Sequence, residues 1–171
     1  KPDGSDAYPN EDWLKIANSH FNLKPDEIIG GPNIPFPNEK EKEIISHYCK
    51  RSFFINGHLA YRKYKSKSRY IDDWLESCNF FISRKKYLEV KGMDPEIYIG
   101  EDQDFFKKLR KTQNIRVFFS KNLFVYHRDR EIYKFFIQRF SFGLDVFDGV
   151  NFDENIKGSL VLLPFLIMFF F

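Results

Sequence analysis

Two kinds of apolar pattern alternate along this chain, and their alternation is the strongest constraint on its fold. Segments with the spacing of amphipathic helices follow short segments that are rich in β-branched and aromatic residues, as strands are. The predicted helices cover residues 10–21, 38–51, 85–90, a stretch after residue 100, and 131–142. The predicted strands lie near residues 27–29, 70–75, 79–83, 115–119 and 123–127. This order predicts an α/β fold, in which helices cover the faces of a sheet.

The predicted helices each have one apolar face to bury. The apolar face of the first helix contains Trp13, Ile16, Ala17 and Phe21. In the helix over 38–51 we expect Ile44, Ile45 and Tyr48 to face inward, and the charged run 39–42 to face solvent. With 171 residues, of which 43% are apolar, the chain is long enough to form one domain with a substantial core.

Charge and cysteine content say little about the function of this chain. The net charge of +3 is too small to indicate a nucleic-acid-binding protein, so we expect no nucleic-acid partner. The basic run 62–69 is interpreted as a surface loop, or as a contact for phosphates of a ligand or of a membrane. Cys49 and Cys78 are far apart and have no Cys or His at metal-ligand spacing, which predicts two reduced thiols.

Both ends of the chain affect the predicted domain organisation. The first residues contain no initiator Met and no apolar leader, so we expect the chain to be cut at its start. Residues 160–171 are apolar throughout, which favours the beginning of a membrane segment over a buried terminal helix or strand. We therefore predict a folded part over 1–147, a linker over 148–158, and the start of a truncated apolar membrane segment over 159–171.

Three carboxylates crowd residues 100–106, those of Glu101, Asp102 and Asp104. They directly follow Gly100, which allows a sharp turn, and precede a helix whose buried face contains Phe105, Phe106 and Leu109. Like charges so close together repel, so the stretch is either a capped helix start or a site that uses carboxylates for chemistry.

Other polar residues also lie where predicted elements end. Asp6 precedes the first helix, Asp73 and Trp74 follow a strand-like segment, and His127 ends the last predicted strand. Ligand sites of α/β proteins form at the ends of strands and the starts of helices. These residue types indicate a carboxylate site, with or without a metal, although a single histidine at a strand end is more often structural.

Four stretches, in this order and spacing, resemble the family 2 glycosyltransferases, which have the GT-A fold. The matching residues are 5–9 with 13–14; 73–80; 91–94 with 100–105; and 125–128 with 138–140 and Gly143. The resemblance covers residues 3 to 147 and implies a partial GT-A fold that lacks its N-terminal nucleotide-binding half.

The resemblance implies a role for each matching residue. Asp6 would be the last acid of the Asp-X-Asp motif that holds a divalent metal, Mn²⁺ or Mg²⁺, and His127 would complete the metal shell. Asp102 would be the catalytic base, with Glu101 beside it. The residues of the acceptor side would be Asp73, Trp74, Cys78 and Asn79. The first acid of the motif is missing, because Gly4 occupies its position.

The expected function is inverting sugar transfer from a nucleoside-diphosphate sugar to a glycan or lipid-linked acceptor, on the cytoplasmic face of a membrane. The C-terminal segment would provide the membrane contact. Two alternatives stay open. One is a non-catalytic module that binds glycans or acidic polymers. The other is a nucleic-acid binder built on residues 62–69, which would show a steep salt dependence.

Overall fold

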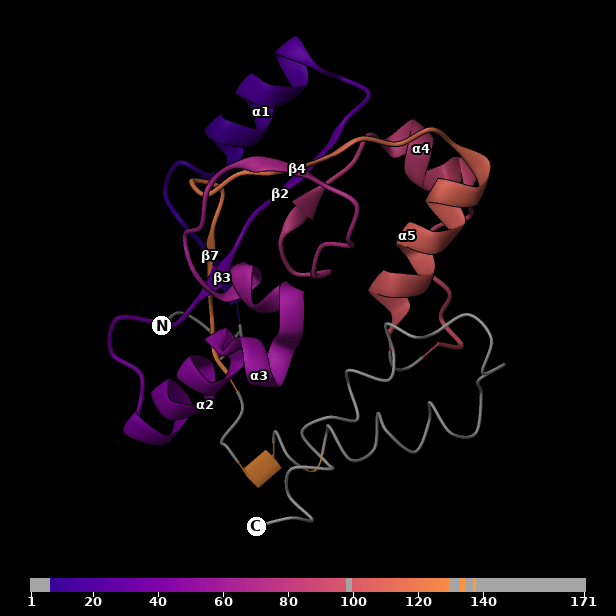
Figure 1. The fold of residues 1–171 in the computed structure, drawn as a ribbon. Helices are drawn as coiled ribbons and strands as arrows, with labels where there is room; N and C mark the ends of the chain where they lie inside the picture. The colour runs from indigo at the N-terminus through magenta and orange to yellow at the C-terminus, as the bar shows by residue number, and fades with distance from the viewer. Residues whose placement is uncertain (1–6, 98–99, 130–132, 135–136, 138–171) are drawn as a thin grey trace. The chain divides into compact units, whose positions relative to one another are not determined.

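The computed structural model describes residues 7–97, 100–129, 133–134 and 137 of the chain (Figure 1). Its strands are β1 (Ala7–Pro9), β2 (Ile28–Gly30), β3 (Asn33–Ile34), β4 (Arg69–Ile71), β5 (Phe80–Phe81), β6 (Val117–Phe119) and β7 (Val125–His127). Its helices are α1 (Trp13–Leu23), α2 (Glu41–Arg51), α3 (Phe53–Asn56), the 3₁₀ helix η1 (Gly57–Lys63), α4 (Arg84–Glu89) and α5 (Glu101–Thr112). The fold is mixed α/β, which confirms the predicted class.

The chain divides into two compact units. Unit 1 comprises residues 1–34 and 64–127, and unit 2 comprises residues 35–63 and 128–171. All the strands named above belong to unit 1. The boundaries predicted at 147 and 158, the helix predicted over 131–142 and the apolar run 160–171 fall wholly or mostly outside the described residues. Within the described residues, no helix has the length and apolar character needed to cross a membrane.

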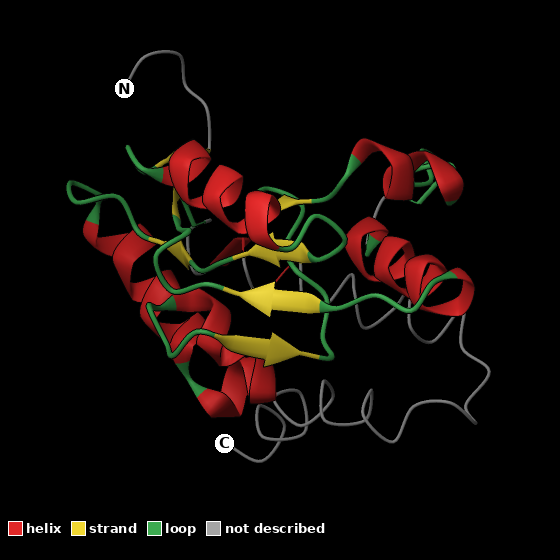
Figure 2. Cartoon of the chain, turned by 90° about the horizontal axis from the view of Figure 1, so that it is seen from above, coloured by secondary structure: helices red, strands yellow, loops and turns green. Residues whose placement is uncertain are grey.

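The strands of unit 1 form two mixed sheets (Figure 2). The larger sheet has the order β4-β6-β2-β5, with β2 and β6 parallel and the two outer strands antiparallel to their neighbours. The smaller sheet has the order β1-β7-β3, in which β1 runs antiparallel and β3 runs parallel to the central β7. The five predicted strands are thus present as β2, β4, β5, β6 and β7, but those predicted at 70–75, 79–83, 115–119 and 123–127 are shorter than predicted.

Strand β5 connects two helical layers, because successive side chains of a strand point to opposite faces of its sheet. The Phe81 ring centroid lies 4.2 Å from that of Trp13 on α1. The neighbouring Phe80 ring lies 5.3 Å from Phe106 on α5, and 6.0 Å from Phe105. The larger sheet therefore has α1 on one face and α5 on the other.

Each layer has a core that the helical spacing predicted. On the α1 side, Ala17 packs with Ile29 and Leu123, and Trp13, Ile16 and Phe21 pack against them. On the α5 side, Phe105, Phe106 and Leu109 are entirely buried. Burying aromatic side chains of this size removes a large apolar area from water, which is the main stabilisation of such a layered unit.

Unit 2 corrects one prediction. Ile45 and Tyr48 on α2 do not face inward but are exposed, and Ile44 is half-buried. The side chains that α2 buries are instead polar: Ser46, His47 and Lys50. The prediction was wrong because helical periodicity identifies an apolar and a polar face, but it does not reveal that a charged partner buries the polar one.

The basic run 62–69 also differs from a simple loop, since Arg62 and Lys63 are buried at the end of η1.

Gly31 lies at a close approach of two backbone segments, which generates a stability prediction. A Cβ atom there would overlap the backbone oxygen of Leu123 and approach that of Ser120. We expect Gly31→Ala to lower the free energy of unfolding by about 3 kcal/mol, because overlapping backbone cannot move aside cheaply. Gly100→Ala has open space and costs only about 1–2 kcal/mol for its left-handed φ of 80°. Urea unfolding followed by tryptophan fluorescence measures both; equal losses would contradict the steric explanation.

Candidate active site at the start of helix α5

Helix α5 begins directly after a left-handed glycine. Gly100 is the N-cap residue with φ 80° and ψ 22°, and no side chain caps the helix there. Its carbonyl accepts the first helical hydrogen bond, from the backbone N–H of Asp104 at 3.0 Å. The first turn contains Glu101, Asp102 and Asp104, where the positive end of the helix dipole stabilises negative charge. The predicted helix start is therefore confirmed.

The three carboxylates of this turn have different partners. Asp102 Oδ1 accepts a hydrogen bond from the backbone N–H of Gln103 at 2.8 Å. Asp104 forms an ion pair of 2.7 Å with Lys108, one helical turn later. A hydrogen bond to Asp104 and its negative charge raise the pKa of Lys108, and Asp94 contributes to the same effect. Asp104 thus has a structural partner in Lys108, and Glu101 and Asp102 remain the predicted acid pair.

The loop of residues 72–79, between β4 and β5, is connected to α5 at two points. The Ser77 hydroxyl donates to Glu101 Oε1 at 3.5 Å, at the first turn of the helix. The Arg110 guanidinium donates to the backbone oxygen of Asp73 at 2.6 Å, near the end of the helix. Between these points Leu75 is entirely buried, and it fixes the loop further. The loop and the acid pair, predicted separately, therefore lie together.

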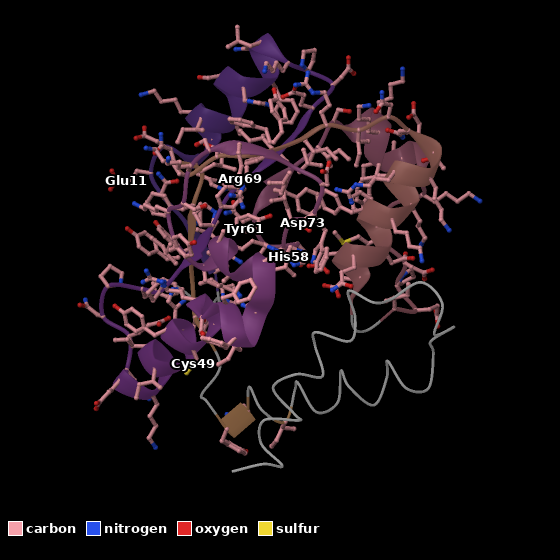
Figure 3. The ribbon with its side chains drawn as sticks, in the orientation of Figure 1. Glu11, Cys49, His58, Tyr61, Arg69 and Asp73 are labelled. Carbon is pink, nitrogen blue, oxygen red and sulfur yellow. The ribbon has the colours of Figure 1, made fainter. Side chains whose placement is uncertain are left out.

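The predicted acceptor residues differ in accessibility. Asp73, Trp74 and Cys78 are partly exposed, and Figure 3 labels Asp73 in the segment that follows β4. Asn79 is entirely buried, so its side chain cannot contact an acceptor. The Trp13 indole N–H donates to Asn79 Oδ1 at 2.9 Å. Asn79 is therefore a residue that positions the loop.

The Asn79 amide also bridges two turns of the backbone. Its nitrogen donates to the carbonyl of Pro32 at 3.1 Å and to that of Leu123 at 3.0 Å. Both N–H groups and the oxygen of the amide are thus satisfied inside the protein, as a fully buried amide requires. This one side chain holds the end of loop 72–79 against helix α1 and against the segments that follow β2 and β6.

Asn33 connects the same loop to the smaller sheet. Its nitrogen donates to Cys78 Sγ at 3.1 Å and also to the Glu76 carboxylate. Asn33 belongs to β3 and pairs with Val125 of β7, the strand that ends at His127. The strand that carries the predicted metal ligand is therefore joined to the loop through Asn33. Both cysteines, Cys49 and Cys78, are free thiols, as predicted.

The predicted metal ligands can be tested only in part, because Asp6 lies outside the described residues. Ala7, the residue after Asp6, pairs directly with His127 in the antiparallel ladder of β1 and β7. Within the described residues, no group of three or more His, Cys, Asp or Glu side chains could hold a metal. A pair consisting of one carboxylate and one imidazole fits a metal that takes its remaining ligands from water and substrate phosphates.

Unit 2 contains a buried ionic cluster that the sequence did not reveal, consisting of His47, Lys50, Lys63 and Asp129. His47 Nδ1 lies 2.8 Å from Asp129 Oδ2, and Lys50 donates to Asp129 Oδ1 at 2.6 Å. Burial alone would raise the pKa of Asp129, but the hydrogen bond from His47 and the charges of Lys63 and Lys50 hold it well below its usual range. The spacing of His47 and Lys50, three residues apart on one helical face, was the available sequence signal for this cluster. Their common partner, Asp129, lies 82 positions from His47 in the sequence.

Glu39 lies beside this cluster and has a perturbed carboxyl group. Burial raises its pKa to about 7, and the negative charges of Asp129 and Glu43 act in the same direction. Backbone hydrogen bonds from Phe36 and Asp129 oppose the shift without cancelling it. Near neutral pH the folded protein thus retains a proton on Glu39 that the unfolded chain releases.

Comparison of the chain with models of known protein families, with curated proteins and with solved structures finds no match in any of the three. The resemblance to family 2 glycosyltransferases therefore stays a prediction, carried by the four sequence stretches.

The Asn79 hydrogen bonds predict a large effect of one buried substitution. Asn79→Leu removes the hydrogen-bond partner of the Trp13 N–H and of the carbonyl groups of Pro32 and Leu123. Each buried polar group that loses its partner costs about 1–3 kcal/mol. We expect a loss of about 3 kcal/mol or more in the free energy of unfolding, measured with urea. Ser77→Ala in the same loop removes one long, exposed hydrogen bond and should change stability by less than about 0.5 kcal/mol. A similar loss in both variants would contradict the role given to Asn79.

The Glu39 shift predicts a pH dependence of stability. The pKa of Glu39 is about 7 in the folded protein and 4.5 as the reference value. Between these values the folded protein holds a proton that the unfolded chain releases, so neutral Glu39 favours the folded state at low pH. That contribution is lost as the pH rises through this window. Glu39→Gln should therefore leave the melting temperature unchanged near about pH 4 and raise it near about pH 8. Glu41→Gln, an exposed change on the same segment, controls for loss of one charge; an equal rise for Glu39→Gln at both pH values would refute the prediction.

Proposed function

We propose that this chain forms the acceptor side of an inverting glycosyltransferase. The reaction transfers a sugar from a nucleoside diphosphate to a hydroxyl group of a glycan or lipid-linked acceptor. The observation that carries the proposal is the pair of contacts between α5 and loop 72–79, Ser77 with Glu101 and Arg110 with Asp73. These contacts bring the acid pair and the half-buried Trp74 to one region of unit 1.

Asp102 is the general base in this proposal. The acceptor hydroxyl must lose its proton while it attacks the anomeric carbon, and a carboxylate about 3 Å from it can accept that proton. The start of α5 suits this role, because the backbone N–H of Gln103 holds the Asp102 carboxylate in place. A single base and no covalent sugar intermediate imply inversion at the anomeric carbon.

Glu101 and loop 72–79 support the reaction by positioning. Ser77 orients the Glu101 carboxylate beside Asp102, and the buried Asn79 holds the end of the loop. Trp74 remains partly exposed between these fixed points, so its ring can stack on the acceptor sugar. Cys78 is also partly exposed and belongs to the same loop.

Asp6 and His127 would hold the divalent metal. When bound, the ion would neutralise the charge of the leaving diphosphate. The support for this pair is the ladder position of Ala7, the residue that follows Asp6 in the sequence, because Ala7 lies opposite His127. The carboxylate would supply the oxygen ligand that Mg²⁺ and Mn²⁺ prefer, and the imidazole is compatible with Mn²⁺.

The proposal is tested by Asp102→Asn in the longest natural chain that contains these residues. We expect sugar transfer to fall by about 10²–10⁴-fold, because Asn cannot accept the proton. Metal-dependent binding of the nucleotide should be nearly unchanged, as measured by calorimetry. Asp104→Asn is the matched control, since it removes a neighbouring carboxylate that is paired with Lys108, and it should retain most of the transfer activity.

Two outcomes would overturn the assignment. Transfer that persists in Asp102→Asn would remove Asp102 as the base. Glycan binding by the wild-type chain, without sugar transfer and without binding of a nucleotide sugar, would favour the non-catalytic binding module instead.

A further inference from the structure

Helix α2 buries its polar side chains and exposes its apolar ones. Ile45 and Tyr48 are 46% and 58% exposed, whereas Ser46, His47 and Lys50 are buried. At about 100° per residue these two sets lie on opposite sides of the helix. The buried ionic cluster accounts for the inner face, because the His47 ring and the Lys50 ammonium group both contact Asp129. That cluster does not account for the apolar outer face.

Helix α3, which follows α2 directly, also exposes apolar side chains. Phe53 and Phe54 are 70% and 74% exposed, and they follow directly on Ser52, whose hydroxyl accepts a hydrogen bond from the Phe54 N–H. We refer to the exposed side chains of Ile45, Tyr48, Phe53 and Phe54 together as the aromatic face. Two adjacent phenylalanines exposed to this extent are unfavourable in water and mark an interaction surface.

Basic side chains lie near Ile45 and Tyr48 on α2. The exposed charged residues between positions 40 and 51 are Lys40, Lys42 and Arg51, which are basic, and Glu41, which is acidic. The Arg51 guanidinium lies 5.2 Å from the centre of the Tyr48 ring. On the helix, Lys42 and Arg51 flank the line of Ile45 and Tyr48 on its two sides. The surface therefore combines aromatic rings with an excess of positive charge.

We propose that the aromatic face binds the surface of a lipid bilayer that contains anionic headgroups. Helices with apolar residues on one face and basic residues at its borders lie in the interface of a membrane, where aromatic rings reach the level of the headgroups. The attraction of each basic residue to anionic lipid adds to this binding. The inference is independent of the proposed enzymatic activity, because it rests only on unit 2.

The charges on this surface favour a bilayer over two other occupants. A second copy of the chain would place the same face against itself, and the basic borders formed by Lys42 and Arg51 would then repel each other. The chain's own apolar run 160–171 contains no acidic residue to meet those two side chains. An anionic lipid surface satisfies the apolar and the basic parts of the face together.

The experiment uses the full chain and follows a probe on the face itself. Phe54→Trp is studied by fluorescence, with the spectrum of the wild type subtracted, and vesicles of phosphatidylcholine and phosphatidylglycerol are added. We expect a shift of the emission to shorter wavelength and quenching by lipids with brominated acyl chains. Leu14→Trp, at an exposed apolar position of α1, is the matched control and should be quenched much less.

Binding constants for the vesicles test the apolar and the basic side chains of the aromatic face separately. Phe53→Ser with Phe54→Ser should lower partitioning onto the vesicles about tenfold or more, because two aromatic rings no longer leave water. The control pair Leu14→Ser with Leu23→Ser, comparably exposed in unit 1, should change it by less than about twofold. Lys42→Gln should weaken binding to anionic vesicles about fivefold and leave binding to neutral vesicles unchanged.

Other outcomes would overturn the proposal. If the emission of the Phe54→Trp variant is already shifted without vesicles and is not quenched by brominated lipid, another part of the chain covers the face. A shift that grows with protein concentration alone would show contact between copies. Equal quenching of the Leu14→Trp control would show that the vesicle contact is not specific to this face.

Discussion

The buried amide of Asn79 is the interaction on which the arrangement of unit 1 depends. It joins the indole of Trp13 to the carbonyl groups of Pro32 and Leu123, so that one side chain connects a helix and two turns of the backbone. A fully satisfied amide in an apolar surrounding is directional in a way that packing alone is not. It therefore fixes where loop 72–79 ends, and with it the strand β5 that separates the two helical layers.

The crowded carboxylates of α5 are compatible with stability because each has a different neighbour. Asp104 is neutralised by Lys108, Glu101 meets the hydroxyl of Ser77, and Asp102 is stabilised by a backbone N–H group. The helix dipole favours all three in the first turn. A helix start and a carboxylate site are thus compatible in the same structural feature, and the two interpretations of the sequence do not exclude each other.

The sequence predicted what depends on local patterns and failed where a distant partner decides. The positions of α1 and α5 and their buried faces followed from helical spacing, and β6 and β7 followed from short apolar runs. The orientation of α2 did not, because the buried Asp129 that reverses it is supplied by a remote segment. Asn79 was predicted as a site residue, but its structural role requires knowledge of which turns meet around it. The resemblance to family 2 glycosyltransferases rests on the residues, order and spacing of four stretches, and it stays a prediction.

The attachments of loop 72–79 have an evolutionary consequence. Arg110 contacts the loop through the backbone of Asp73. Leu75 and Asn79 are buried, so these two positions tolerate few changes. Trp74 and Ser77 belong to the same loop but keep part of their surface in solvent. New side chains at such positions can alter what the surface recognises without unfolding the scaffold. In this loop, some residues serve folding and others are available for recognition. The specificity of the surface can therefore change during evolution while the fold is retained.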